Sequence, residues 1–353
     1  MTKRSKKQLA PAPSVDLVAL AEVVERFPAK TVVVLGDFVA DAFQYGDITR
    51  VSREAPVLIL KHRATQIVPG GGANAANNFA ALGAKVIPVT AVGEDLPGTR
   101  LREFLGAQNV DVSGIFGAED WTTPTKNRFL AGWAHKVGQQ VLRVDYEPDH
   151  SLPASIHKKI HAKLVAALKK ADALAISDYG FGVAVPAELA KLLPHTKRGT
   201  IATLDSRYRL ADYARAGFHS ATPNEGELES LHHTTIGKNL AELERCGRAT
   251  LAEMKLESLV VTRGRDGIAL FQPAMETVHI PIHGSDQAVD VTGAGDTVLA
   301  AYTLALASGA STLEAAHLAN IAGGLVVMKH GTATVSRAEL LDAIGSSASG
   351  KNS

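Results

Sequence analysis

The strongest constraint on the fold is a regular alternation of helix and strand patterns from residue 148 onward. Segments of helical periodicity separate short apolar runs, which lie at 173–176, 200–204, 220–223 and 259–262. Strands that are joined through helices run parallel, and the sheet they form is covered by helices on both faces. We therefore predict an α/β fold with a doubly wound, mostly parallel sheet. Two earlier apolar runs, at 31–35 and 86–92, are expected to belong to the same sheet.

A second group of extended segments is too polar for the centre of such a sheet. These segments alternate only partly and lie at 41–46, 56–68, 112–116, 125–130 and 139–145. Alternation of this kind is typical of half-exposed strands. We predict a small β-sheet lid, built from about 38–68 and 112–146, within one domain that spans residues 15–346. A basic, disordered tail is expected at 1–14 and a second disordered tail at 347–353.

The bulk composition excludes several classes of protein. The chain has 37 Lys+Arg against 36 Asp+Glu, without the basic excess of a nucleic-acid-binding surface. Cys246 is the single cysteine, which excludes an internal disulfide framework. The sequence has neither a membrane-spanning apolar run nor a signal peptide. We therefore expect a cytoplasmic protein without nucleic acid or membrane partners, and we interpret the His232-His233 pair as surface.

The most informative motif is Asp290-Val291-Thr292-Gly293-Ala294-Gly295-Asp296, directly before an apolar helix. Small residues at a helix start leave backbone N–H groups free to face an anion, and the helix dipole favours negative charge there. Gly293, Ala294 and Gly295 are therefore predicted to form an anion hole. Asp296 would lie beside the bound anion and accept a proton from an attacking hydroxyl. The simpler interpretation is a tight turn with Asp296 near the helix cap.

This motif resembles the signature of the ribokinase-like (PfkB) carbohydrate kinases. Pro69-Gly70-Gly71-Gly72-Ala73-Asn74 resembles their second signature, in the family's order, and the resemblance extends over about residues 31–344. It implies a doubly wound α/β domain with a β-sheet lid over the sugar. It also implies transfer of the γ-phosphoryl group of ATP to a sugar hydroxyl, with Mg²⁺ and, in many members, a monovalent cation such as K⁺.

The resemblance also implies roles for individual residues. Asp37, Gly71, Gly72 and Asn74 would contact the sugar. The nucleotide and its phosphates would be bound by Asn224, Glu227, Thr262, Arg263, Gly264, Asn320 and Gly323. Glu227 would also organise Mg²⁺ indirectly, and Asp290 and Thr292 would contribute to a monovalent cation site. Simpler structural interpretations remain open: Asn224 as a helix N-cap, Glu227 on a solvated helix face, Asn320 as a buried polar group, and Asp37 as the start of a turn.

Within the family, the sequence is most similar to the D-glycero-β-D-manno-heptose 7-phosphate kinases of ADP-heptose synthesis. The shared stretches include Ser52-Arg53-Glu54-Ala55-Pro56 and Ser177-Asp178-Tyr179-Gly180. A phosphorylated substrate needs cationic partners, and two or three of five lid residues are expected to face it. These residues are Arg50, Arg53, Lys126, Arg128 and Arg143.

The sequence departs from that branch on the nucleotide side. Phe181 stands where a lysine often occurs, and Asp205-Ser206-Arg207 replaces Asp-Pro-Lys. Without the His-x-Gly-His motif of the nucleotidyltransferase that often accompanies such kinases, nucleotidyl transfer would need a separate protein. The resemblance further suggests a homodimer that pairs through the lid.

Alternative functions also follow from the sequence. The acceptor could be another sugar, such as fructose or ribose, or the chain could be a non-catalytic, sugar-binding regulatory relative. An intact Asp296 argues against a mere binder, since binding needs no base. A dinucleotide-dependent oxidoreductase is excluded because Gly36 is not followed by glycines at fingerprint spacing.

Overall fold

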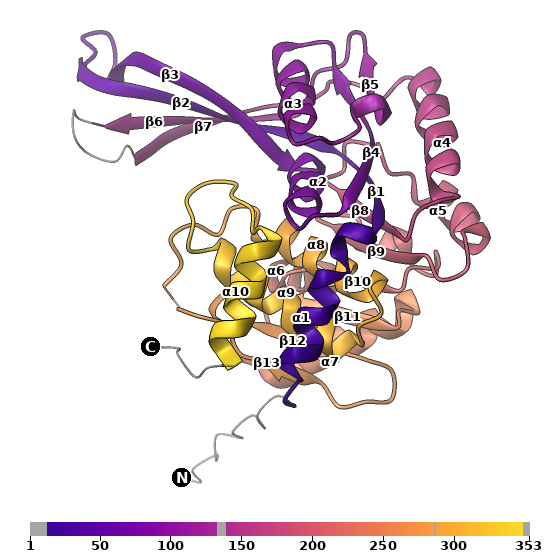
Figure 1. Cartoon of the computed structure of the whole chain (residues 1–353). Helices are drawn as coiled ribbons and strands as arrows, with labels where there is room; N and C mark the ends of the chain where they lie inside the picture. The colour runs from indigo at the N-terminus through magenta and orange to yellow at the C-terminus, as the bar shows by residue number, and fades with distance from the viewer. Residues whose placement is uncertain (1–12, 133–138, 286, 349–353) are drawn as a thin grey trace, which may run out of the picture.

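The computed structural model describes residues 13–132, 139–285 and 287–348. It contains two β-sheets, a nine-stranded one that forms the body and a four-stranded one that projects from it (Figure 1). This confirms the predicted α/β class. Most of the predicted basic tail and the last five residues of the predicted C-terminal tail lie outside the described residues. Among the described helices, none is long and apolar enough to cross a membrane.

The nine-stranded sheet has the order β13-β12-β11-β10-β9-β8-β1-β4-β5. All neighbouring strands pair in parallel except β11 with β12 and β12 with β13, which are antiparallel. In chain order, the strands are β1 (Thr31–Gly36), β4 (Lys85–Gly93), β5 (Ile115–Ala118), β8 (Ala173–Asp178), β9 (Ile201–Ser206), β10 (Ser220–Ala221), β11 (Ser258–Thr262), β12 (Ile268–Phe271) and β13 (Val278–Ile280).

Ten helices among the described residues accompany the sheets. They are α1 (Leu17–Glu25), α2 (Gly72–Ala81), α3 (Leu96–Ala107), α4 (Ala154–Leu168), α5 (Pro186–Leu192), α6 (Glu225–His232), α7 (Leu240–Met254), α8 (Ala294–Ala307), α9 (Thr312–Val326) and α10 (Arg337–Ala348). The last helix continues two residues past the predicted boundary at 346. Residues 347–348 are therefore helical rather than part of a disordered tail.

Side-chain alternation along β1 divides the core into two layers. Val32 and Val34 pack with α1, α2, α8, α9 and α10 on one face of the sheet. Val33 and Leu35 pack with α4, α5, α6 and α7 on the other face. Successive side chains of a strand point to opposite faces, so a continuous run of β-branched residues is buried on both sides. The carboxyl ends of β1, β8, β9 and β11 meet at one edge of this sheet.

The four-stranded sheet has the order β3-β2-β6-β7. Its strands are β2 (Phe38–Val51), β3 (Leu58–Gly71), β6 (Thr125–Gly132) and β7 (Gln139–Tyr146). Only Asp37 separates β1 from β2, and β3 runs directly into α2. The sequence prediction was wrong to include residues 112–118 in this sheet. β5 instead pairs in parallel with β4 at the edge of the body, because Ile115 and Ala118 are buried there.

Candidate active site

Asp296 lies in the first turn of α8 and is almost completely buried. Its Oδ2 accepts a hydrogen bond of 2.7 Å from the Nδ2 of Asn74 on α2, while its Oδ1 has no partner among the described residues. Burial raises the pKa of Asp296 to about 7, although the bond from Asn74 opposes this rise. A carboxylate with such a pKa and one free oxygen is suited to accept a proton near neutral pH.

The turn before Asp296 presents backbone donors to the same space. Gly293 has a positive φ of 77°, and a Cβ at this position would lie 2.5 Å from Asn74 Nδ2, so only glycine fits. The N–H of Ala294 donates to the carbonyl of Val291 at 3.3 Å. Among the described residues, the N–H groups of Gly293 and Gly295 have no such acceptor. We therefore attribute the predicted anion hole to Gly293 and Gly295 rather than to all three residues.

A cavity of about 430 Å³ opens in front of Asp296, between the two sheets. Its carboxylates are those of Asp41, Asp205, Glu227 and Asp296. Its cations are Lys126 and Arg128 on β6, Arg143 on β7, and Arg207 after β9. Gly71, Thr262, Thr292, Gly293 and Gly295 also line it. The mixture of a base, backbone donors and cations suits the binding and transfer of a phosphoryl group.

The predicted lid cations divide into two groups. Lys126, Arg128 and Arg143 face the cavity, as two or three of the five were expected to do. Arg128 also pairs with Asp41 at 2.5 Å, and Arg143 Nε bonds Asp145 at 2.7 Å. Arg53 is exposed between β2 and β3 and does not line the cavity. The prediction that Arg53 contacts substrate is therefore not supported within a single copy of the chain.

A second cavity of about 340 Å³ adjoins the first and shares Asn224, Thr262, Val291 and Gly295 with it. Gly264, Asn320 and Gly323 line this cavity, with apolar walls from α8 and α9. Asn320 Nδ2 donates to the carbonyl of Pro281 at 2.7 Å, which is the buried polar role left open above. An apolar slot beside a phosphate-binding turn has the form expected for a nucleobase and ribose.

Arg263 turns toward α6 rather than into this cavity. Its side chain is 5% exposed and pairs with Glu225 at 2.8 Å, and it is absent from the walls of both cavities. Because this ion pair joins the loop after β11 to α6, Arg263 supports the backbone of the site. Its neighbours Thr262 and Gly264 do line the second cavity, and a contact between Arg263 and the nucleotide phosphates stays a prediction.

Two carboxylates, Asp205 and Glu227, face the cavity beside Asp296. Asn224 caps α6 in a capping box: its side-chain oxygen accepts from the backbone N–H of Glu227, and its own backbone N–H donates to the Glu227 carboxylate. Burial, then the negative charges of Glu227 and Asp296, raise the pKa of Asp205. No three acidic, histidine or cysteine side chains among the described residues come close enough to hold a metal alone. Mg²⁺, however, commonly uses one or two carboxylates together with waters and substrate phosphates, which this pair fits.

Asp290 ties the motif to the loop that follows α9. Its carboxylate accepts hydrogen bonds from the N–H groups of Thr292 and Gly331, both at 2.9 Å. These hydrogen bonds outweigh partial burial and lower the pKa of Asp290, so it stays ionised. Thr292 lines the first cavity. A monovalent cation between Asp290 and Thr292 remains a prediction.

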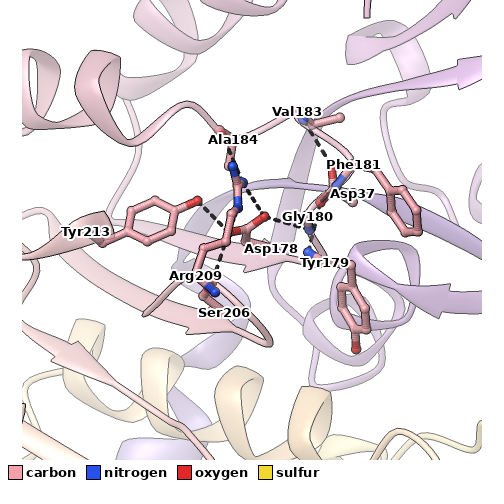
Figure 2. Close-up of polar contacts among 10 residues, drawn as sticks. All are labelled: Asp37, Asp178, Tyr179, Gly180, Phe181, Val183, Ala184, Ser206, Arg209 and Tyr213. Atoms are coloured by element: carbon pink, nitrogen blue, oxygen red, sulfur yellow. Dashed lines mark hydrogen bonds and ion pairs between the residues drawn. The ribbon is translucent and has the colours of Figure 1, made fainter. Parts of the chain in front are cut away.

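The structure gives Asp37 a different role from the predicted one. Its buried carboxylate accepts three backbone hydrogen bonds, from Tyr179 at 2.8 Å and from Phe181 and Val183 at 3.0 Å (Figure 2). It is not part of the cavity wall. Burial and the nearby Asp178 raise the pKa of Asp37 to about 6. Asp37 therefore fixes the loop after β8, and the prediction that it binds sugar hydroxyls was wrong.

The neighbouring glycine-rich segment also differs from expectation. Gly71 lines the first cavity, but Gly72 and Asn74 do not. Gly72 packs against the backbone of Asp37, where a Cβ would lie 3.1 Å from the carbonyl oxygen. Asn74 is fully buried and bonds Asp296 instead of lying along the sugar. Of these three residues, only Gly71 is placed to contact a substrate.

Sequence reasoning missed several cavity residues, chiefly Asp41, Tyr179, Asp205 and Arg207. Asp41 could have been recognised from the sequence, because it is an acidic residue flanked by apolar residues. Arg207 was noted only as a departure from a motif. Tyr179 gave none, since its approach to the cavity depends on how Asp37 binds the loop after β8.

Taken together, a doubly wound sheet, a buried carboxylate at a helix start with free backbone N–H groups and an adjoining second cavity have the form expected of a phosphotransferase for small molecules. A family model described as pfkB family carbohydrate kinase matches residues 29–339. The chain belongs to this family. This is a family of carbohydrate kinases.

Curated relatives include the "Bifunctional protein HldE" of Geobacter metallireducens, which is 38% identical over 88% of this chain and 62% of the relative. The protein of the same name from Mesorhizobium japonicum is 36% identical over 92% of this chain and 64% of the relative. The chain therefore spans less than two thirds of the length of these relatives.

Two solved structures share the fold. Ribokinase of Arabidopsis thaliana, complexed with ribose and ATP, has a TM-score of 0.69 and 20% identity, covering 89% of this chain and 98% of that one. Phosphofructokinase-2 of Escherichia coli with fructose-6-phosphate has a TM-score of 0.70 and 20% identity, covering 90% and 98%. At this identity, the likeness concerns the fold and confirms its ribokinase-like architecture.

Proposed function

We propose that the chain transfers the γ-phosphoryl group of ATP to the anomeric hydroxyl of a heptose 7-phosphate. The observation that carries this proposal is that Lys126, Arg128 and Arg143 face the same cavity as Asp296. Cations on the wall opposite a base fit a substrate with an anionic group at one end and a reactive hydroxyl at the other. The likeness to proteins named HldE supports the same branch.

In the proposed reaction, the free Oδ1 of Asp296 takes the proton of the sugar hydroxyl as its oxygen attacks the γ-phosphorus of ATP. The bond between the γ-phosphorus and the bridging oxygen breaks, and ADP leaves with that oxygen. The N–H groups of Gly293 and Gly295 stabilise the charge on the transferring group. The four-stranded sheet acts as a lid that excludes water.

The divalent metal is proposed to be Mg²⁺, organised by Asp205 and Glu227. When bound, it would neutralise charge on the phosphate oxygens. Asn224, Thr262, Gly264, Asn320 and Gly323 would hold the nucleotide in the second cavity. K⁺ between Asp290 and the Thr292 carbonyl is a further proposal, because Asp290 remains ionised and lies beside the anion-binding turn.

The test is ATP consumption by the purified chain with Mg²⁺ and a panel of acceptors. The panel contains heptose 7-phosphate, fructose, fructose 6-phosphate, ribose and adenosine. Because a charge-assisted contact contributes roughly 1.5–3 kcal/mol, kcat/KM for heptose 7-phosphate should exceed that for unphosphorylated sugars by about 100-fold. A preference for fructose or ribose would reject the heptose assignment. No turnover of any acceptor would instead favour a regulatory sugar-binding protein.

We further propose that two copies pair through the four-stranded sheet. The support is a row of exposed apolar side chains at alternate positions of the edge strand β7, which therefore share one face: Leu142, Val144 and Tyr146. Exposed apolar patches on a sheet often mark contact surfaces. Analytical ultracentrifugation of the unmodified protein should give a mass near twice the 37.1 kDa of the chain. The Leu142→Glu variant should instead sediment with the mass of a monomer. A monomer in the unmodified protein would contradict the proposal.

A further inference from the structure

Tyr179 lines the first cavity, yet it was assigned no role in the sequence analysis and has none in the proposed reaction. It lies directly after β8, at the edge where the strands of the body end. Its ring faces the four-stranded sheet, and the Nζ of Lys126 on β6 lies 5.1 Å from the ring centre. An aromatic ring of the body thus contacts a cation of the other sheet at the point where the two sheets enclose the cavity.

Lys126 has an unusual environment for a lysine. It is partly buried and makes no ion pair within the described parts of the chain. Burial lowers its pKa, and the nearby guanidinium groups of Arg207, Arg143 and Arg128 act in the same direction, against the Asp41 carboxylate. Asp41 already pairs with Arg128. The carboxylates of Asp145 and Asp296 also attract Lys126 electrostatically. The Tyr179 ring adds a cation–π contact, since the face of an aromatic ring attracts an ammonium.

The backbone holds Tyr179 in place. Asp37 accepts the N–H of Tyr179 together with two further N–H groups of the same loop, and Asp178 accepts the N–H of Gly180 at 3.0 Å. Gly180 has a positive φ of 88°, which turns successive N–H groups toward different carboxylates. In Figure 2, the ring of Tyr179 points away from both carboxylates. Its hydroxyl bonds no described residue, and its ring packs beside Gly71, where a Cβ would lie 3.2 Å from Tyr179 Cε2.

Asp178 is anchored in turn from the opposite side. Arg209 binds it through Nη2 at 2.7 Å and Nε at 3.2 Å, and the hydroxyl groups of Tyr213 and Ser206 donate to it at 2.8 and 2.9 Å. These donors satisfy the oxygens of a carboxylate whose side chain is fully buried. The loop that carries Tyr179 is therefore fixed by two buried carboxylates, one of which has its own cationic partner.

We propose that Tyr179 is a positioning residue that holds the Lys126 ammonium toward the anionic end of the substrate, and thereby sets the preference for a phosphorylated over a neutral sugar. This inference rests on the proposed function, since it concerns recognition of the sugar phosphate. It assigns Tyr179 no part in phosphoryl transfer. The effect of changing it should fall on binding of the phosphorylated acceptor, with little change in turnover or in ATP binding.

The first test compares Tyr179→Leu, which removes the ring, with Tyr179→Phe, which removes only the hydroxyl. Loss of a desolvated cation–π contact should raise KM for heptose 7-phosphate about tenfold in Tyr179→Leu. The kcat and the KM for ATP should stay within about twofold of wild type, and Tyr179→Phe should behave like wild type. Tyr45→Leu, at a half-buried tyrosine on β2 that lines neither cavity, serves as the matched control. An unchanged KM in Tyr179→Leu, or an equal rise in Tyr179→Phe, would overturn the inference.

A double-mutant cycle separates positioning from a merely structural role. If Tyr179 acts through Lys126, then Tyr179→Leu should add almost nothing to the KM of a Lys126→Met variant. Fully additive effects would reject the inference. Wild-type turnover of heptose 7-phosphate is measured first. Its absence would overturn the proposed function, whereas turnover with additive variants would overturn only the role of Tyr179.

Discussion

The Asp296→Asn variant is expected to lose about three orders of magnitude in kcat, within the range for removal of a general base. The asparagine oxygen can still accept the hydrogen bond from Asn74, so the geometry of the turn is retained. Sugar binding and folding should therefore remain close to wild type. Single-turnover and steady-state kinetics, with sugar binding measured by calorimetry, would check this. If the Asp296→Asn variant turned over within tenfold of wild type, Asp296 would not be the base.

The pH dependence of kcat/KM tests the proposed role of Asp296 independently. Burial raises the pKa of Asp296 to about 7, and only the ionised form can accept a proton. In the wild type, kcat/KM should therefore rise with pH up to about 7 and then level, because this parameter reports the free enzyme. A profile that is flat from pH 5.5 to 8 would contradict the assignment.

The raised pKa of Asp296 also predicts how Asp296→Asn changes the stability of the fold. A folded-state pKa above the unfolded value means that the protonated carboxyl favours folding at low pH, and that this contribution is lost as pH rises to about 7. At pH 8, a neutral asparagine should therefore unfold at the same temperature as the wild type or higher. A strong loss of stability would show instead that the carboxylate is structural.

Replacing Asp37 by alanine is expected to lower the free energy of unfolding by about 3–5 kcal/mol, because it leaves three buried N–H groups without an acceptor. These groups belong to Tyr179, Phe181 and Val183. Urea denaturation measures the change. Asp149→Ala, at an exposed acidic position, is the matched control and should stay within about 0.5 kcal/mol of wild type.

The sign of the pH effect distinguishes this explanation from a general loss of packing. Because the pKa of Asp37 is raised to about 6, its contribution to stability is full below the unfolded value and decreases as pH rises through about 6. The difference between wild type and Asp37→Ala should therefore be larger at pH 5 than at pH 8, by about 1 kcal/mol. A difference that grows with pH would contradict this account.

The sequence was sufficient to predict the body of the fold and the position of Asp296 at the start of a helix. The β-branched run of β1 and the small residues before Asp296 act locally, through strand formation and through the start of a helix. Local patterns of this kind are visible in a single sequence. They placed Gly293, Gly295 and Asp296 in one cavity with Lys126, Arg128 and Arg143, as predicted.

The errors concern side chains whose direction depends on distant contacts. Asp37 turns toward a loop 142 to 146 residues away in the sequence. Asn74 meets Asp296 across 222 residues. β5 belongs to the body because it pairs with β4. None of these pairings has a signature in local periodicity, so a motif could indicate the neighbourhood of each residue but not its partner.

The direct junctions between the two sheets limit how the smaller one can move. β2 follows β1 after one residue, and α2 follows β3 without any linker. The base of the β2–β3 hairpin therefore cannot be displaced far from the body. Its motion reduces to rotation about an axis through Asp37 and Gly71. A 14-residue strand spans roughly 45 Å, so a swing of about 10° would carry its far end about 8 Å. Small changes in backbone torsion angles near Asp37 and Gly71 would therefore move the far end of the hairpin by several ångströms.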